Sequence, residues 1–192
     1  MAFGCTKLTL DGIRQEAFLI LNAAQEIKRT TEARAAETVD LNDALEESIK
    51  RVLASRPEAE ERIQVIRNLA HDLPPLYVER NSLLDTFVSI IQNGIEAISK
   101  EGVLSLATCL GSVNDQPSIE VRISDTGVGI PPDDIPKVFD LFYTTKEQGL
   151  GFGLWRDRAF VRKLGGNIEV SSAIGVGTTF TLKFPVRSDA LS

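Results

Sequence analysis

Residues 125–155, DTGVGIPPDDIPKVFDLFYTTKEQGLGFGLW, combine an acidic residue with two glycine clusters. Glycine costs conformational entropy in ordered structure, so a cluster indicates backbone that turns with positive φ or lies close to another group. Asp125 directly follows the alternating segment IEVRIS and is expected at a strand end, where its carboxylate could accept a hydrogen bond from a ligand amine such as an adenine amino group. Gly127 and Gly129 would let the backbone pass close to that ring. A plain Asx turn leading into two prolines is the alternative.

The second cluster, GLGFGLW, places Gly149, Gly151 and Gly153 directly before a helical pattern. Backbone amides at the N-terminus of a helix bind phosphate groups, so this cluster is predicted to bind a phosphate chain. Lys146, a few residues upstream, supplies the compact cation that such a site needs. A flexible loop with a helix cap is the alternative interpretation.

A phosphate chain at neutral pH normally brings magnesium, which prefers oxygen ligands and keeps several waters. Asn93 is the candidate ligand, because it lies in the middle of a predicted helix on the face opposite the apolar stripe. Asparagine is a mediocre helix former, so its presence there favours a specific role. An ordinary solvated side chain is the alternative.

Apolar residues spaced by three or four predict the helices that position these residues. Residues 81–102 form the clearest of them, with Gly102 as the stop. A second helix begins near residue 40, with Asp40 or Asn42 as its N-cap. A third covers residues 10–36 and is either an ordinary amphipathic helix lying on the domain or a helix that faces a partner for dimerisation.

Alternation of apolar and polar residues predicts the strands. One strand is expected around residues 63–66, and hairpins are expected at residues 103–125 and 167–185. Two hairpins, a strand and three flanking helices predict a two-layer α/β sandwich, preceded by the N-terminal helix.

The composition excludes several other classes of protein. A net charge of −6 and a pI near 4.9 would repel a nucleic-acid backbone, and no basic stripe interleaved with aromatic residues is present. No apolar run approaches the length of a membrane span, and the N-terminus does not resemble a secretory signal, so a cytoplasmic location is expected. The 2 cysteines lie far apart without a histidine cluster, which argues against a disulfide framework or a zinc site.

Five segments, VSIIQNGIEAI, DTGVGIP, FDLFYTTK, GLGFGLW and GVGTTF, resemble in that order the N box, first glycine box, F box, second glycine box and third glycine box of the GHKL superfamily. The resemblance is strongest to the catalytic ATP-binding domain of bacterial sensor histidine kinases, and it covers roughly residues 38–186. FYTTKEQGLGFGL resembles the short ATP lid of kinases of the nitrogen-regulation type. The resemblance implies the Bergerat fold, in which ATP lies between a helical layer and a mobile lid.

The same resemblance implies roles for individual residues. Asn93 would ligate magnesium and would act in catalysis together with Lys146. Asp125 would bind the adenine amino group, and Thr178 would assist it through a hydroxyl group or a water. The other residues implied in the nucleotide site or its lid are Gly127, Gly129, Phe139, Phe142, Thr145, Gly149, Gly151 and Gly153.

Three positions depart from the pattern of the superfamily, and the only histidine lies outside its motifs. Ser89 stands four residues before Asn93, where Asn, His or Glu is usual, and a serine cannot act as a carboxylate base for water, which disfavours the self-contained ATPase branch. Phosphoryl transfer to a histidine needs less from this position. Leu150 stands where Thr or Ser is common and Phe152 where Leu is common, which suggests altered nucleotide binding. His71, in HDLPP, lies beside predicted strand structure and is interpreted as a surface or turn residue, not as a phosphate acceptor.

The predicted organisation has three parts. Residues 1–37 are the N-terminal helix, interpreted as a remnant second helix of a dimerisation hairpin, residues 38–187 are the catalytic domain, and residues 188–192 are a tail. The predicted function is donation of the γ-phosphoryl group of Mg-ATP to a histidine on a dimerisation domain, with a response regulator downstream and a homodimer through the N-terminal helix. The alternatives are a serine kinase of the anti-sigma-factor type and a nucleotide-responsive interaction module without catalysis.

Overall fold

The computed structural model describes three stretches of the chain, residues 35–113, 116–146 and 149–186. The helix predicted over residues 10–36 lies almost entirely outside the described residues, as does the tail predicted at residues 188–192. Ala35 and Ala36, which the helix was expected to include, are not helical. The reason is that the chain is already extending into a strand that begins at Glu37.

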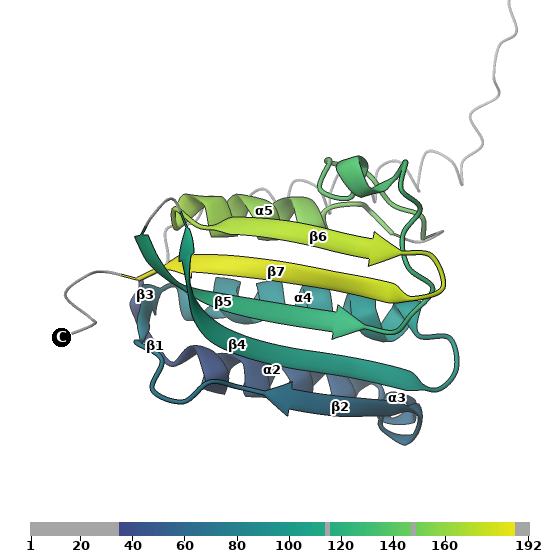
Figure 1. Cartoon of the computed structure of the whole chain (residues 1–192), viewed down its shortest axis with the longest axis horizontal. Coiled ribbons are helices and arrows are strands. Elements are labelled where there is room, and N and C mark those ends of the chain that lie inside the picture. The colour runs from purple at the N-terminus through teal and green to yellow at the C-terminus, as the bar shows by residue number, and fades with distance from the viewer. Residues whose placement is uncertain (1–34, 114–115, 147–148, 187–192) are drawn as a thin grey trace, which may run out of the picture.

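A mixed sheet carries the fold, with strands in the order β2-β4-β5-β7-β6 (Figure 1). The strands are β2 (Ile63–Asn68), β4 (Gly102–Val113), β5 (Gln116–Asp125), β6 (Asn167–Ala173) and β7 (Gly177–Pro185). β2 and β4 are parallel, and the other neighbouring pairs are antiparallel. The predicted strand and both predicted hairpins are confirmed. The alternation of apolar and polar residues predicted these strands correctly, because the residues of β5 that face the core, such as Val121 and Ile123, are apolar and buried.

Three helices cover one face of this sheet (Figure 1). They are α2 (Leu41–Ser55), α4 (Arg80–Ala97) and α5 (Gly153–Lys163), and two short helical segments are α3 (Pro57–Arg62) and η1 (Ile135–Lys137). The core lies between the layers, where Phe87 of α4 meets Phe184 of β7 edge to face, with ring centroids 6.3 Å apart. This confirms the two-layer α/β sandwich. In the ranges that the structure describes, none of the helices has the length and apolar character of a membrane span.

The start of α2 resolves the choice between two capping residues. The side chain of Asp40 accepts a hydrogen bond from the amide of Asp43 at 3.0 Å and is the N-cap. Asn42 instead points across the domain, where its Nδ2 donates to the carbonyl of Ala70 at 2.9 Å and its Oδ1 accepts from the hydroxyl of Thr108 at 2.9 Å. Asn42 therefore joins the helical layer to β4.

The predicted end of α4 was wrong. The helix ends at Ala97, and Gly102 is the first residue of β4. The guanidinium of Arg62 donates to the carbonyl oxygens of Ile95 and Ile98, so a residue distant in sequence satisfies the last turn of the helix. A glycine stop was not needed, because that capping interaction is tertiary.

A separate two-stranded antiparallel sheet pairs β1 (Glu37–Val39) with β3 (Leu76–Val78). β3 is the short apolar segment that follows Pro74 and Pro75. β1 was not predicted, because three residues are too few for alternation to be recognised. The boundary expected at Thr38 falls inside β1, so the described domain begins with a strand.

The loop after β5 packs against the β6–β7 turn, and two glycines there allow a matched test. Gly129 and Gly175 have φ values of 75° and 73°, but a Cβ on Gly129 would lie 2.1 Å from the carbonyl oxygen of Ala173, whereas a Cβ on Gly175 would meet nothing within 4 Å. We expect Gly175→Ala to lower the free energy of unfolding by about 1 kcal/mol, which is the cost of the backbone conformation alone. Gly129→Ala should lower it by at least about 2 kcal/mol more, because backbone must move. Denaturant titration measures both, and equal losses would show that the contact at Gly129 is easily relaxed.

Candidate functional site

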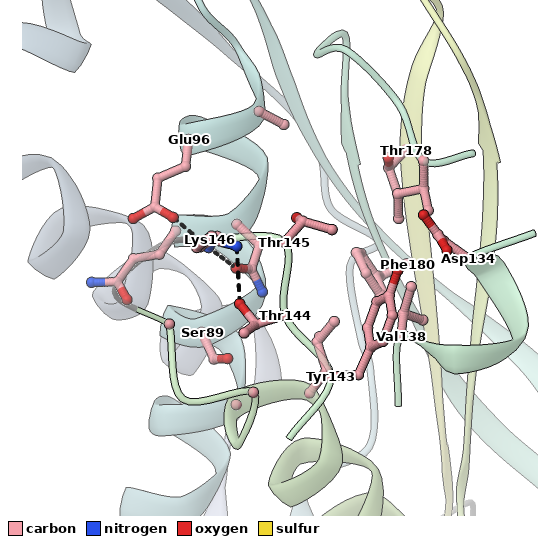
Figure 2. Close-up of a pocket in the computed structure, with 18 of the residues that line it drawn as sticks. Ser89, Glu96, Asp134, Val138, Tyr143, Thr144, Thr145, Lys146, Thr178 and Phe180 are labelled. Atoms are coloured by element: carbon pink, nitrogen blue, oxygen red, sulfur yellow. Dashed lines mark hydrogen bonds and ion pairs between the residues drawn. The ribbon is translucent and has the colours of Figure 1, made fainter. Parts of the chain in front are cut away.

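A cavity of about 690 Å³ lies between α4, the loop after β5 and the segment that leads into α5. Its size is in the range of small-molecule sites. The predicted site residues that line it are Asn93, Asp125, Gly129, Thr145, Lys146, Gly149, Gly151, Gly153 and Thr178. Gly127 and Phe142 do not line it. Figure 2 shows Lys146 and Glu96 on one side of the cavity and Thr178 and Asp134 on the other.

Backbone amides hold the carboxyl group of Asp125 at the end of β5. Its Oδ1 accepts hydrogen bonds from the amides of Gly127 at 2.8 Å and Thr178 at 3.3 Å. Its Oδ2 makes no hydrogen bond with the part of the chain that the structure describes, so this oxygen is left to accept one from a ligand in the cavity. Burial raises the pKa of Asp125, and the two amides partly oppose that shift.

The two glycines after Asp125 allow close packing of backbone. A Cβ on Gly127 would lie 2.6 Å from the carbonyl carbon of Ala97, the last residue of α4. Gly129 lines the cavity, and its missing side chain faces the β6–β7 turn. Both positions need glycine for the fold itself, whether or not a ring lies against them.

The hydroxyl group of Thr178 contacts Ser172, not Asp125. The two hydroxyl oxygens are 2.9 Å apart. Ser172 donates its proton to the carbonyl of Gly177 at 2.9 Å, so Thr178 is the donor between the two hydroxyls. The lone pairs of the Thr178 hydroxyl are thereby left to accept a hydrogen bond from a ligand or a water in the cavity. Only the backbone amide of Thr178 supports Asp125.

Lys146 closes the opposite side of the cavity by bonding to α4. Its Nζ lies 2.6 Å from Oδ1 of Asn93 and also pairs with the carboxylate of Glu96. Burial tends to raise the pKa of Glu96, but its contacts with Lys146 and Arg56 outweigh burial and lower it. Asn93 and Glu96 thus offer two oxygen donors one helical turn apart, the donor type that magnesium prefers. The cation Lys146 holds those oxygens in this structure.

We define the lid as residues 142–151. Its first and last residues contact each other through their backbones. The amide of Phe142 donates to the carbonyl of Gly151 at 3.1 Å, and a Cβ on Gly151 would lie 2.3 Å from the carbonyl carbon of Phe142. Phe142 is exposed and packs edge to face on Phe152, with centroids 5.1 Å apart. Phe139 is buried and packs on Phe180. Phe139 therefore fixes the segment before the lid to the core, whereas Phe142 fixes the start of the lid to Phe152 at the protein surface.

Asp157 of α5 is completely buried behind the cavity. Its Oδ1 lies 3.4 Å from the guanidinium of Arg156, and its Oδ2 has no hydrogen-bond partner among the described residues. Burial raises the pKa of Asp157 to about 7, with Asp85 adding to the rise, while Arg156 and a hydrogen bond from Ser89 oppose it. An aspartate in this state costs stability, because its charged form is desolvated without full compensation.

The three positions that depart from the expected motifs all lie at the cavity. Ser89, Leu150 and the buried Phe152 all line it. His71 is exposed in a bend between β2 and β3, as predicted. It lies outside the lining of the cavity.

Sequence reasoning missed Glu96, Ser172 and Asp157. Glu96 could have been found, because it follows Asn93 by three residues and shares its helix face. Asp157 also left a signal, since it precedes the buried Val161 by four residues and places a charge on the inward face of α5. Ser172 left none, because its role depends on the pairing of β6 with β7.

Comparison with known proteins gives concordant results. The family described as "Histidine kinase-, DNA gyrase B-, and HSP90-like ATPase" matches residues 79–188. The chain is similar to the signal transduction histidine-protein kinase AtoS of Escherichia coli K12, with 33% identity over 79% of this chain and 24% of AtoS. Sporulation kinase E of Bacillus subtilis strain 168 is 34% identical over 67% of this chain and 17% of that kinase. The chain thus spans a quarter or less of the length of these two relatives.

Solved structures show the same fold. The catalytic domain of the histidine kinase ThkA, in a nucleotide-free form, superposes with a TM-score of 0.67 at 22% identity, covering 79% of this chain and 96% of that domain. At this identity the likeness concerns the fold alone. It agrees with the mixed sheet and helical layer described above.

The burial of Asp157 generates a prediction about stability and pH. Its folded pKa of about 7 lies above the ordinary value of 3.8, so the folded state retains a proton that the unfolded state has lost, and the free energy of unfolding falls as pH rises between these values. Asp157→Asn should remove this fall in the free energy of unfolding, because asparagine does not titrate. We compare the free energy of unfolding of Asp157→Asn with that of wild type at each pH. The advantage of the variant should be about 2 to 3 kcal/mol larger at pH 8 than at pH 5. Denaturant titration at both pH values tests this, with the exposed Asp43→Asn as control. Parallel pH curves for wild type and Asp157→Asn would contradict it.

Proposed function

The chain belongs to the family of histidine kinase-, DNA gyrase B- and HSP90-like ATPases and contains the ATP-binding catalytic domain of a histidine kinase, and from this we propose that it transfers the γ-phosphoryl group of Mg-ATP to a histidine on a separate dimerisation domain. The observation that carries the proposal is the polarity of the cavity. Asp125 offers a hydrogen-bond acceptor on one side, and Lys146 offers a cation beside oxygen donors on the other. Adenine and the phosphates of ATP need these two environments in one cavity.

Asp125 is proposed to recognise the adenine amino group. Its Oδ1 is held by two amides, so Oδ2 is fixed in position and can accept one hydrogen bond without reorganisation. The Thr178 hydroxyl, oriented by Ser172, is a second acceptor beside it. Gly129 lines the cavity, with its missing side chain facing the β6–β7 turn.

Magnesium fits the other side of the cavity. Asn93 and Glu96 would supply oxygen ligands, and the ion would neutralise charge on the phosphates during transfer. Lys146 must then leave Asn93, because a magnesium ion and an ammonium group repel each other at one oxygen. Lys146 would move to the phosphates together with the amides near Gly149 and Gly151, so the lid would close on the nucleotide.

The acceptor histidine is proposed to come from another domain or chain. The only histidine of the sequence, His71, is exposed in a bend and lies outside the lining of the cavity. A dimerisation domain that carries the acceptor, a downstream response regulator, homodimer formation and a cytoplasmic location complete the proposal. The name of the relative AtoS, a signal transduction histidine-protein kinase, supports the acceptor domain and the response regulator.

Phosphorylation in trans tests this function. The chain is incubated with radiolabelled Mg-ATP and the isolated dimerisation domain of AtoS as a supplied acceptor. We expect label on the acceptor that is lost in acid and retained in base, which is the behaviour of phosphohistidine. Acid-stable label would indicate a serine kinase instead. ATP binding without label on any tested histidine acceptor would favour a nucleotide-responsive interaction module.

Substitution of Asp125 tests adenine recognition. Asp125→Asn should weaken ATP binding by about ten- to a hundredfold, because a charge-assisted hydrogen bond is lost. Titration with a fluorescent ATP analogue measures this, and Asp140→Asn, an exposed aspartate nearby, is the control. Unchanged affinity in folded Asp125→Asn would remove this residue from the site.

Substitution of Asn93 tests the metal site separately. Asn93→Ala should abolish the gain in ATP affinity that magnesium produces and should change adenosine affinity by less than about twofold, since adenosine carries no phosphate for the ion to bridge. Asn68→Ala, at the exposed end of β2, is the matched control. If ATP and adenosine weaken to the same extent, the role of Asn93 is structural.

A further inference from the structure

Ser172 belongs to a row of three polar side chains at the side of the cavity that contains Asp125. It is paired with Thr178 across β6 and β7, and Thr178 is paired with Asp125 across β7 and β5. Residues directly opposite each other in antiparallel strands share a face of the sheet, so the three side chains lie next to one another. Asp125 and Thr178 line the cavity, whereas Ser172 lies at the end of the row, outside the lining.

The hydroxyl group of Ser172 makes three hydrogen bonds, which is its full capacity. Its Oγ accepts from the backbone amide of Ile130 at 2.8 Å and donates to the carbonyl of Gly177 at 2.9 Å. The hydroxyl oxygen of Thr178 lies 2.9 Å away, and Ser172 has only a lone pair left for it. Thr178 therefore donates its proton to Ser172 and presents only lone pairs to the cavity.

The backbone donors beside this row are committed in the same way. The amides of Gly127 and Thr178 donate to Oδ1 of Asp125. The amide of Ile130 donates to Ser172. Oδ2 of Asp125 and the hydroxyl oxygen of Thr178 both offer lone pairs to a ligand. A base is stabilised there when it presents N–H groups, and it is destabilised when it presents an oxygen, because lone pairs then face lone pairs.

We propose that Ser172 makes the cavity selective for 6-aminopurine nucleotides against 6-oxopurine nucleotides, because it holds the Thr178 hydroxyl in an orientation that cannot donate to a base. The inference rests on the proposed function and on its assignment of Asp125 to the amino group of the base. Ser172 is a positioning residue, since it acts on the base through Thr178. A Thr178 hydroxyl that rotated freely could give its proton to a 6-oxo group, and the cavity would then accept both kinds of base.

The loop after β5 has other attachments, so Ser172 can be substituted without releasing it. The amide of Gly175 donates to the carbonyl of Val128 at 2.9 Å, and the backbone of Gly129 packs closely on that of Ala173. Ser172→Ala should therefore fold and lose only the hydrogen bonds of the hydroxyl group.

The test compares the affinities of ATP and ITP, the triphosphates of adenosine and inosine, which present an amino group and an oxygen at the same ring position. Each nucleotide competes with a fluorescent ATP analogue for the full chain, with magnesium and at pH 8, which favours the ionised form of Asp125. Wild type should prefer ATP by at least about tenfold, and Ser172→Ala should lower that preference by about fivefold. The change should come mainly from tighter binding of ITP.

Three further variants accompany Ser172→Ala. Ser171→Ala is the matched control, because Ser171 is exposed and its side chain lies on the opposite face of β6. Ser172→Thr keeps the hydroxyl group and should keep the ratio of the two affinities within about twofold of wild type. Ser172→Cys fills a similar space with a sulfur that accepts hydrogen bonds only weakly, so its ratio should fall as in Ser172→Ala. Ser172→Cys carries the test if Ser172→Ala does not fold.

Substitution of Thr178 separates orientation of the hydroxyl from a structural role of Ser172. Thr178→Val has no hydroxyl group to orient. Adding Ser172→Ala to this variant should therefore change the ratio of ATP to ITP affinity by less than about twofold.

Several results would overturn the selectivity and leave the proposed function intact. One is equal affinity of wild type for ATP and ITP. Another is a Ser172→Ala variant that weakens both nucleotides to the same extent, and a third is an equal effect of Ser172→Ala with threonine or valine at position 178. Failure of wild type to bind either nucleotide would overturn the proposed function and the selectivity together.

Discussion

The site depends on the close approach of three backbone segments around Asp125. The loop after β5 lies against the end of α4 at Gly127, against the β6–β7 turn at Gly129, and against the start of β7 at Gly177, whose Cβ would lie 1.9 Å from the carbonyl oxygen of Asp125. These contacts bring the amides of Gly127 and Thr178 onto one carboxylate oxygen. A side chain at any of the three glycines would separate the segments and release the carboxyl group.

The opposite side of the cavity is held less firmly. Lys146 is half exposed, and its contacts with Asn93 and Glu96 are polar and open to solvent. Backbone contacts between Phe142 and Gly151 hold the two ends of the lid together. The proposed acceptor for adenine is therefore held by two backbone amides, whereas the cation proposed for the phosphates is held only by exposed side-chain contacts. That asymmetry suits a site that must hold a nucleotide and then release its product.

Asp157 lowers the stability of the fold from within α5. The inward face of α5 contains Asp157 and Val161, both buried, so an apolar residue at the first position would serve the core better. The aspartate instead lies between Ser89 and Arg156, where its charge is neither solvated nor fully paired.

The sequence by itself determined the sheet, the helices that flank it and the identity of the main cavity residues. Alternation along β5, the apolar stripe of α4 and the order of the glycine clusters are local properties, and Asn93, Asp125 and Lys146 could be located from them. The end of α4 was misjudged, because Arg62 caps it from another element. The terminal segments stay outside the described residues and their predicted roles are untested.

Only the tertiary structure decided how these residues are connected. The Ser172–Thr178 contact requires the register of β6 on β7, and the contact of Lys146 with Glu96 requires the lid to lie over α4. The closeness of Ser89 to Gly153 requires α4 to pack on α5. Each joins segments whose separation in sequence is unrelated to their distance in space. Periodicity reports which face of an element a residue occupies, and the residue that it meets there is decided by packing.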